Sequence, residues 1–351
     1  MVRVGRRQVA LRATQPRVTT KRYLVTGGAG FIGSALVRAL VGAGQQVRVL
    51  DDESRGSARR LADVAAAIEM IAGDVRDPAA VRAAVRGTDA VCHLAAVNGT
   101  EFFYGRPELV LEVAVKGMLN VLDACVAEGV GELALTSSSE VYQTPPVVPT
   151  DETAPLSIPD PFNPRYSYAA GKMISELLAI NYGRRRLRRV VIVRPHNVYG
   201  PDMGWEHVIP QLALRVQEIV RGSPAGPVRL PIQGTGRETR AFVHLDDFIG
   251  GFRLVLEHGE HLGLYHIGTM HEVQIAEVAR LVGAAFGREV EVVPGPPAAG
   301  SPPRRGPDTA KVAALGFRPA VPLRDGIAAT VRWYREHARE APPAVGPAAG
   351  A

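Results

Sequence analysis

Residues 24–34 read Leu-Val-Thr-Gly-Gly-Ala-Gly-Phe-Ile-Gly-Ser, and this stretch decides the fold. The apolar run 23–25 predicts a buried strand, and residues 30–42 predict a helix that begins inside the stretch. Its glycines allow a tight turn, close backbone approach to a pyrophosphate and close packing of the helix on the strand. The first amides of the helix point at the phosphates. We therefore predict a dinucleotide-binding loop that includes Gly27, Gly30, Phe31, Ile32 and Gly33.

An acidic residue follows the next predicted strand, which spans residues 46–50. Asp51 has the spacing of a carboxylate that binds the adenosine ribose hydroxyls. Because a carboxylate there repels a 2′-phosphate, the sequence favours NAD over NADP. Arg55 keeps NADP open, since an arginine just past this strand can accept the 2′-phosphate.

Composition limits the classes of protein. The chain has 351 residues, enough for one large α/β domain with a lobe. Its net charge of +6 comes from residues 1–22, which carry seven Lys and Arg and no acid. The rest is close to neutral, so the charge predicts no nucleic-acid partner. We expect residues 1–21 to form a disordered basic arm, with an organellar transit peptide as the alternative, and residues 339–351 to form a disordered tail.

Apolar runs and cysteines bear on whether the protein is in a membrane, on its cellular compartment and on metal binding. The longest apolar runs have the length of strands, so we expect no transmembrane helix and no membrane partner. Cys92 and Cys125 lie in a predicted strand and a predicted helix, as reduced core residues of a cytoplasmic protein do. No Cys/His cluster has the spacing of metal ligands, so we predict no metal.

Strand and helix patterns alternate down to about residue 200. Strands are predicted at 67–71, 90–95, 132–136 and 190–193, and helices at 34–43, 77–86, 107–128 and 166–182. This alternation predicts an α/β fold, a Rossmann-type doubly wound parallel sheet that binds NAD, over residues 22–200. Beyond residue 200 helices are predicted at about 207–221, 246–258 and 272–286. We expect residues 201–338 to form mainly a smaller C-terminal substrate-binding lobe over the open edge of the sheet.

Ligands of such sheets bind beyond the carboxyl ends of the strands. Asp74 and Val75 follow the third strand and are candidate adenine contacts. The residues that follow Leu94, Thr136 and Val193 occupy the same edge.

Two groups of residues suggest chemistry. Tyr168 and Lys172 share one face of a predicted helix, and the ammonium is expected to lower the pKa of the phenol. Such a tyrosine can take a proton from a sugar hydroxyl while hydride leaves the same carbon. Tyr166 has no lysine four residues later. Ser137, Ser138 and Ser139 follow the strand at 132–136, where hydroxyls can bind a reacting oxygen.

Together these motifs resemble the extended short-chain dehydrogenase/reductase family, in its NAD-dependent nucleotide-sugar epimerase/dehydratase branch. The resemblance covers about residues 22–335. The motifs that carry it are the glycine loop, His93-Leu94-Ala95-Ala96, the serine run, Tyr168 with Lys172, the segment from Arg194 to Pro201, and the segment from Gly234 to Phe242.

The resemblance implies roles for single residues. Ser138 would share the substrate 4-hydroxyl with Tyr168, and Lys172 would hold the nicotinamide ribose. Leu94, Ala95 and Ala96 would contact the cofactor, Ser139 would join Ser138 at the substrate, and Glu140 would lie among the catalytic residues. The nucleotide diphosphate would be bound by Asn197, Val208, Arg240 and Arg305.

The sequence also departs from the family pattern. Ala114 replaces a structural asparagine and Gln143 replaces a common glycine. The 4,6-dehydratases have Asp-Glu where this chain has Ser139-Glu140, so the acid that would protonate the leaving 6-hydroxyl is missing. Glu140 itself is retained, as in the decarboxylases and dehydratases.

On this basis we expect an NDP-hexose 4-epimerase that works through a transient 4-keto sugar and regenerates NAD. A UDP-glucuronate decarboxylase or an NDP-sugar 4,6-dehydratase is the alternative, and a non-catalytic NAD-binding scaffold is a remote one. The resemblance also implies a homodimer that pairs through helices 107–128 and 166–182.

Overall fold

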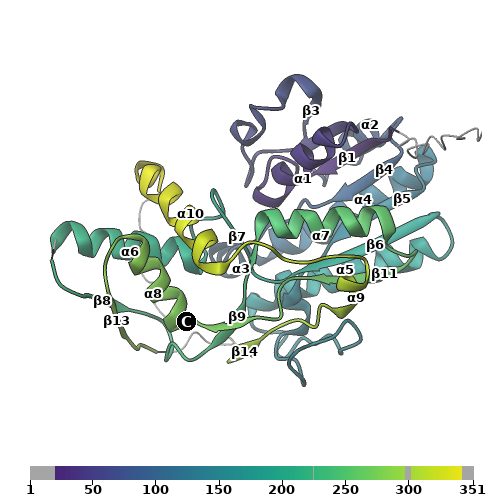
Figure 1. The fold of residues 1–351 in the computed structure, drawn as a ribbon. Coiled ribbons are helices and arrows are strands. Elements are labelled where there is room, and N and C mark those ends of the chain that lie inside the picture. Colours follow the sequence, from purple (N-terminus) through teal and green to yellow (C-terminus); the bar gives the residue numbers. More distant parts are fainter. Residues whose placement is uncertain (1–19, 224, 297–301, 342–351) are drawn as a thin grey trace, which may run out of the picture.

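The computed structural model describes residues 20–223, 225–296 and 302–341, and over these residues its central element is a parallel sheet of seven strands (Figure 1). The strand order is β11-β6-β5-β4-β1-β2-β3. This order confirms the predicted Rossmann-type doubly wound sheet. Most of the predicted arm and tail lies outside the described residues. The strands are β1 (Arg22–Thr26), β2 (Gln46–Asp51), β3 (Ile68–Ala72), β4 (Ala90–His93), β5 (Glu132–Thr136), β6 (Arg189–Pro195) and β11 (Gly263–Ile267).

Helices cover both faces of the sheet, so its central strands are apolar on both sides. On β6, Val190 and Ile192 belong to one hydrophobic cluster, whereas Val191 and Val193 belong to the other. The first cluster lies under α2 (Pro78–Val85), α4 (Pro107–Glu128) and α5 (Ser167–Gly183), and the second under α1 (Phe31–Gly42) and α7 (Leu245–His258). Each of these helices agrees with a predicted one to within a few residues.

Two elements from beyond residue 200 return to the sheet. The edge strand β11 pairs in parallel with β6, from Gly263 opposite Val191 to Ile267 opposite Pro195. Helix α7, drawn in green, crosses in front of the sheet in Figure 1. The sheet therefore includes a strand from beyond residue 200, so the predicted domain boundary at residue 200 divides the sheet.

The remaining chain forms a lobe with its own core. Helices α6 (Val208–Gly222), α8 (Ile275–Ala285) and α10 (Leu323–Glu336) gather around β8 (Val228–Pro231) and β13 (Val290–Val293), at the left of Figure 1. This core includes Ile209, Val278 and Val331, all buried. The short elements are α3 (Thr100–Gly105), α9 (Ala310–Ala314), β7 (Val198–Tyr199), β9 (Thr239–Ala241), β10 (Val243–His244), β12 (Glu272–Gln274), β14 (Arg304–Arg305) and 3-10 turns at Ala58–Leu61, Ala65–Ala67, Ser139–Tyr142, Pro164–Tyr166 and Ala338–Glu340.

Two other features of the described residues bear on the setting. None of their helices is both long and apolar enough to cross a membrane. Cys92 and Cys125 are both buried and form no disulfide. Burial raises the pKa of each thiol to about 12, so neither is a reactive thiolate.

Candidate active site

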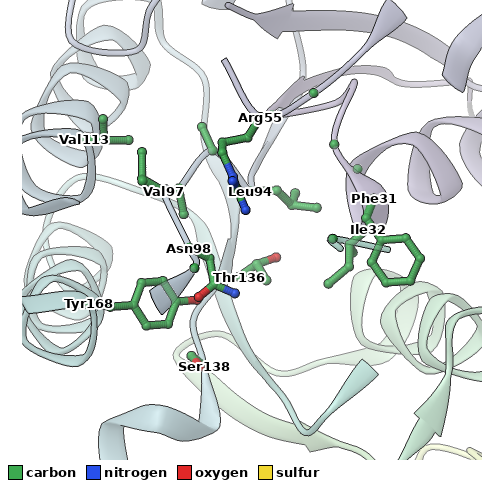
Figure 2. A pocket seen from close by; sticks show the side chains of 18 of the residues that line it. Phe31, Ile32, Arg55, Leu94, Val97, Asn98, Val113, Thr136, Ser138 and Tyr168 are labelled. Carbon is green, nitrogen blue, oxygen red and sulfur yellow. The ribbon is translucent and has the colours of Figure 1, made fainter. Parts of the chain in front are cut away.

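A cavity of about 480 Å³ opens at the carboxyl ends of the sheet strands (Figure 2). Its walls come from the ends of β2, β4, β5 and β6, from the glycine loop and from the segment after Gly200. The structure brings every predicted cofactor residue into this wall: Gly27, Gly30, Phe31, Ile32, Gly33, Asp51, Asp74, Val75, Leu94, Ala95, Ala96 and Lys172.

The N-terminus of α1 can accept an anion. Gly30 precedes the helix without a capping side chain, and the first turn carries no acidic residue. A Cβ atom at Gly33 would lie 2.1 Å from the carbonyl oxygen of Gly27, so only glycine lets the helix pack this closely on the loop. Exposed amides at a helix N-terminus fit a pyrophosphate.

Asp51 ends β2 with its carboxylate fixed in the cavity wall. Its Oδ2 accepts the amide of Ala29 at 2.9 Å and its Oδ1 accepts the amide of Glu53 at 2.8 Å. Burial raises the pKa of Asp51, against these two hydrogen bonds. The fixed carboxylate fits a ribose diol, which needs an acceptor at a set position.

Tyr168, Lys172 and Ser138 face the same cavity, and Figure 2 shows the Tyr168 hydroxyl pointing into it. The Lys172 Nζ donates to the carbonyl oxygen of Thr136 at 2.8 Å and lies 5.8 Å from the centre of the Tyr168 ring. The Thr136 hydroxyl is buried and has no partner among the described residues. The unpaired hydroxyl leaves a polar contact for a ligand at this end of the cavity.

The prediction that Lys172 lowers the pKa of Tyr168 is wrong for this structure. Burial raises the pKa of Tyr168 to about 12, although a hydrogen bond with Ser138 opposes the rise. Burial also lowers the pKa of Lys172 to about 8. Sequence spacing placed the two groups on one face but could not show how strongly both are desolvated.

A buried ion pair supports the serine run from below. The Arg194 Nη2 lies 2.5 Å from the Glu176 Oε2, and both side chains are 3 % exposed. Ser137 donates to the same glutamate, and Arg194 also donates to the Tyr142 hydroxyl. These contacts link the segment after β5, where the serine run lies, to α5 and β6.

Arginines surround Glu140, which lines the same cavity as Ser138 and Tyr168. Glu140 forms an ion pair with Arg305, and Arg165 and Arg240 lie near it. Burial raises the pKa of Glu140, but Arg305, Arg165 and Arg240 outweigh it and the net shift is downward. Glu140 is therefore ionised at neutral pH.

The predicted substrate residues fall into two groups. Ser138, Ser139 and Asn197 line the cavity, whereas Val208, Arg240 and Arg305 do not. Val208 begins α6 directly after His207, which does line the cavity. Asn197 donates its side-chain amide to the carbonyl oxygen of Ala241 at 2.8 Å.

Arg240 donates to two backbone carbonyls, at Thr239 and Pro302. Burial, with the charge of Arg305, lowers its pKa to about 10. Arg305 keeps Nε and Nη2 unpaired among the described residues.

The structure explains two departures from the family pattern. Gln143 has a φ of +52°, a backbone conformation that glycine adopts without strain. Its side chain offsets this by donating to the carbonyl oxygen of Glu140 at 2.7 Å. Ala114 is buried on α4 where α5 crosses it, and a Cβ atom at Gly171 would lie 2.7 Å from the Ala114 Cβ.

Several lining residues were not predicted as site residues: Asn98, Thr136, Arg165, Glu206 and His207. Thr136 ends β5 and Asn98 lies in the loop that follows β4, so the rule for parallel sheets points to both places. Arg165 lies in the short 3-10 turn Pro164–Tyr166 and Glu206 lies in the loop before α6, and no local pattern marks either residue.

Comparison with known proteins agrees with this geometry. Residues 23–268 match the sequence model of the NAD dependent epimerase/dehydratase family. A dTDP-4-dehydro-6-deoxy-D-allose reductase of Streptomyces bikiniensis is 32 % identical over 93 % of this chain and all of its own length. Curated relatives of similar identity include dTDP-glucose 4,6-dehydratases and UDP-glucuronic acid decarboxylases.

Solved structures show the same fold with NAD bound. DesIV, a dTDP-glucose 4,6-dehydratase of Streptomyces venezuelae, is 35 % identical with a TM-score of 0.79 and covers 91 % of this chain and 98 % of its own. A UDP-glucose 4-epimerase of Thermus thermophilus is 33 % identical with a TM-score of 0.76, and covers 90 % of this chain and 99 % of its own. The relatives therefore catalyse different outcomes on related substrates.

Proposed function

This chain belongs to the NAD-dependent epimerase/dehydratase family, and we propose that it is a nucleotide-sugar 4-epimerase. The family match establishes an NAD-dependent enzyme of the epimerase, dehydratase and decarboxylase group. We propose the 4-epimerisation reaction itself and the role of each site residue in it.

The cavity fits NAD at both ends. The uncapped amides of α1 would hold the pyrophosphate, and Asp51 would hold the adenosine ribose. Lys172 and the unpaired Thr136 hydroxyl would hold the nicotinamide end. When bound, NAD supplies reversible hydride acceptance at the sugar carbon.

Tyr168 would move the proton of the sugar 4-hydroxyl, and Ser138 would hold the same oxygen. With a pKa of about 12, Tyr168 is protonated at neutral pH, so it is ready to donate. To accept a proton it needs its pKa lowered, and cationic charge beside the ring does this. Lys172, 5.8 Å from the ring centre, does not achieve this alone, because burial dominates the pKa of Tyr168; the positive nicotinamide of NAD⁺, when bound, would supply further charge.

The ionised state of Glu140 is the observation that favours 4-epimerisation over 4,6-dehydration. Loss of the 6-hydroxyl requires a proton donor at that oxygen. Glu140 is ionised and paired with Arg305, and its neighbour is Ser139 rather than an acid. The other carboxylates that line the cavity within the described residues are Asp51, Asp52, Asp74 and Glu206, which lie at or just after the ends of β2 and β3 and in the loop before α6, whereas Ser138 follows β5.

Product analysis tests the proposal. NMR of the products formed from a panel of UDP-, dTDP-, GDP- and CDP-sugars reports the fate of C4, C5 and C6. We expect inversion at C4, retention of the 6-hydroxyl and no net NADH. Steady production of NADH, or of a 4-keto-6-deoxy product, would contradict the proposal.

One observation favours a second candidate, decarboxylation of UDP-glucuronate. Arg165 lines the cavity three residues before Tyr168, and its buried Nε has no partner among the described residues. A guanidinium there suits a sugar carboxylate. Release of CO₂ from UDP-glucuronate would establish this candidate in place of the first.

We also propose a cytoplasmic homodimer that pairs through α4 and α5, with the lobe over residues 201–338 binding most of the nucleotide sugar. Val126 on α4 and Ile174 and Leu177 on α5 are exposed apolar side chains, which supports pairing through these helices. Light scattering of the wild type and of Leu177→Glu tests the dimer. A wild-type monomer would contradict it.

A further inference from the structure

Two arginines of one loop face the cofactor cavity. Arg55 and Arg60 follow Asp51 on the segment between β2 and β3, and both line the cavity. A free guanidinium at this place is the usual receptor for the 2′-phosphate of NADP. Whether these arginines are free therefore bears directly on cofactor choice.

Carboxylates from outside the NAD-binding loop hold Arg55. Its guanidinium forms an ion pair with Glu206, which lies 151 residues later and lines the same cavity. A second carboxylate, Glu101, lies 3.3 Å from its Nη1. The guanidinium also lies 4.8 Å from the centre of the Phe102 ring. Arg55 thus has three side-chain partners.

Two glycines leave room for this ion pair. A Cβ atom at Gly99 would lie 3.1 Å from the Glu206 Oε1 and 3.3 Å from the Arg55 Nη2. A Cβ atom at Gly204 would lie 2.7 Å from the Glu206 Oε2. Burial raises the pKa of Glu206, but Arg55 and His207 outweigh it, and the net shift is downward. The carboxylate therefore stays ionised at neutral pH and the pair persists.

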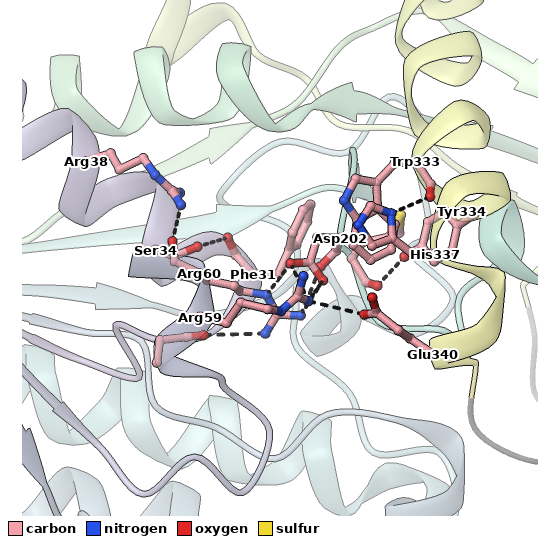
Figure 3. Close-up of polar contacts among 12 residues, drawn as sticks. Phe31, Ser34, Arg38, Arg59, Arg60, Asp202, Trp333, Tyr334, His337 and Glu340 are labelled. Atoms are coloured by element: carbon pink, nitrogen blue, oxygen red, sulfur yellow. Dashed lines mark hydrogen bonds and ion pairs between the residues drawn. The ribbon is translucent and has the colours of Figure 1, made fainter. Parts of the chain in front are cut away.

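The neighbouring arginine is held in the same way. Figure 3 shows Arg60 and Arg59 converging on Asp202, four residues before Glu206. The Arg60 Nη2 lies 2.9 Å from the Asp202 Oδ1, and its Nε lies 3.0 Å from Oδ2. The segment 202–206 thus supplies one carboxylate to each arginine of the loop that lines the cavity.

We propose that Glu206, together with Glu101, determines the preference for NAD by keeping Arg55 occupied. A 2′-phosphate would meet the carboxylate of Asp51 and could recruit Arg55 only by breaking its two ion pairs. Cofactor choice would then rest on the substrate lobe as well as on the Rossmann motif. The proposal concerns binding alone and holds whichever sugar reaction the enzyme catalyses.

A competition experiment separates the effect of Asp51 on cofactor choice from that of Glu101 and Glu206. Wild type, D51S, E101Q/E206Q and D51S/E101Q/E206Q are each incubated with equal NAD⁺ and NADP⁺, freed of unbound nucleotide and denatured. Chromatography then gives the ratio of bound NADP⁺ to bound NAD⁺. Equilibrium dialysis with each nucleotide gives the affinities where retention is weak.

We expect D51S alone to change the ratio by less than about threefold, because Arg55 stays paired. The triple variant should favour NADP⁺ at least about tenfold more than D51S, the effect of one charge-assisted hydrogen bond to phosphate. Adding R55A to the triple variant should remove the gain. E206D in the D51S background should behave as D51S.

D63N is the matched control, since it breaks the Arg38–Asp63 pair, which lies outside the cavity wall. It should leave the ratio unchanged. Thermal unfolding confirms that each variant is folded, and D51S/E206Q replaces the triple variant if that one is not. The proposal would be overturned if D51S and the triple variant gave the same ratio of bound NADP⁺ to bound NAD⁺. It would also be overturned if the triple variant kept its gain in NADP⁺ binding after R55A was added.

Discussion

At the scale of single residues, the site combines groups whose charges depend on burial. His93, behind the cavity wall, donates or accepts a 2.8 Å hydrogen bond at Thr26, and burial lowers its pKa to about 3. It is therefore neutral at neutral pH. Tyr168 and Lys172 are the titratable pair to which the proposed reaction assigns the proton transfer.

Replacing Tyr168 with phenylalanine should lower turnover by about 10²- to 10⁴-fold, the usual contribution of a positioned acid or base. The Phe103 ring stacks on Tyr168 at 5.4 Å and would stack equally on phenylalanine, so the fold and NAD content should be retained. Steady-state turnover and nucleotide content measure the two effects. Tyr166→Phe is the matched control, and equal losses in both variants would refute the assignment.

Lys172 predicts a pH dependence of stability. Its pKa is about 8 in the folded protein and 10.5 in the unfolded chain, so between these values the unfolded chain binds more protons. Stability from this residue should therefore rise with pH across that window, by about 3 kcal/mol in all. Below pH 8 both states are charged and the cost of burying the ammonium is fully present.

Urea unfolding of the cofactor-free protein at pH 7 to 10.5 measures this effect. The difference in free energy of unfolding between wild type and Lys172→Met isolates it from other titrations. We expect the variant to be the more stable at pH 7 and the difference to shrink as the pH rises. A difference that is constant with pH would show that Lys172 has an ordinary pKa.

At the scale of elements, the junction of β1 and α1 is the most demanding part of the site. Gly33→Ala would place a Cβ atom 2.1 Å from the Gly27 oxygen, whereas at Gly30 the nearest atom would be 3.1 Å away. We expect Gly33→Ala to abolish NAD retention and Gly30→Ala to weaken it less. Nucleotide content after purification measures both. Gly42→Ala, which meets nothing within 4 Å, should match wild type.

Local signals predicted most elements of the sheet. The glycine loop, Asp51 and the helices at 107–128 and 166–182 are continuous patterns of adequate length. The lobe strands β8 and β13 were missed because each has four residues and takes its partner from about sixty residues away. Strand β11 was missed for the same reason, since its pairing with β6 is not written in either segment alone.

Site residues follow the same division. Tyr168 and Lys172 were predicted from their spacing of four residues on one helix, and Ser138 from its place just after strand β5. Glu206 was not, because its importance comes from Arg55, 151 residues earlier in the chain. Desolvation of the Tyr168–Lys172 pair was equally beyond the sequence, since it depends on packing from several elements.

At the scale of the whole molecule, the sheet depends on chain beyond the predicted domain boundary. A fragment ending at residue 200 lacks β11 and α7. It would expose the edge of β6 and the apolar face that Phe248 and Phe252 cover. We expect this fragment to aggregate while the full chain stays dispersed. Soluble yield and circular dichroism measure this, and a cooperatively folded fragment would show that residues 22–200 are an independent domain.

The place of β11 has a consequence for folding during synthesis. A ribosome makes β6 about seventy residues before its outer neighbour, and the first lobe helix lies between them. The nascent sheet therefore keeps β6 as an unpaired, hydrophobic edge strand until roughly three quarters of the chain has been made. At 5–20 residues per second this interval lasts several seconds, long enough for chaperones to bind the exposed edge.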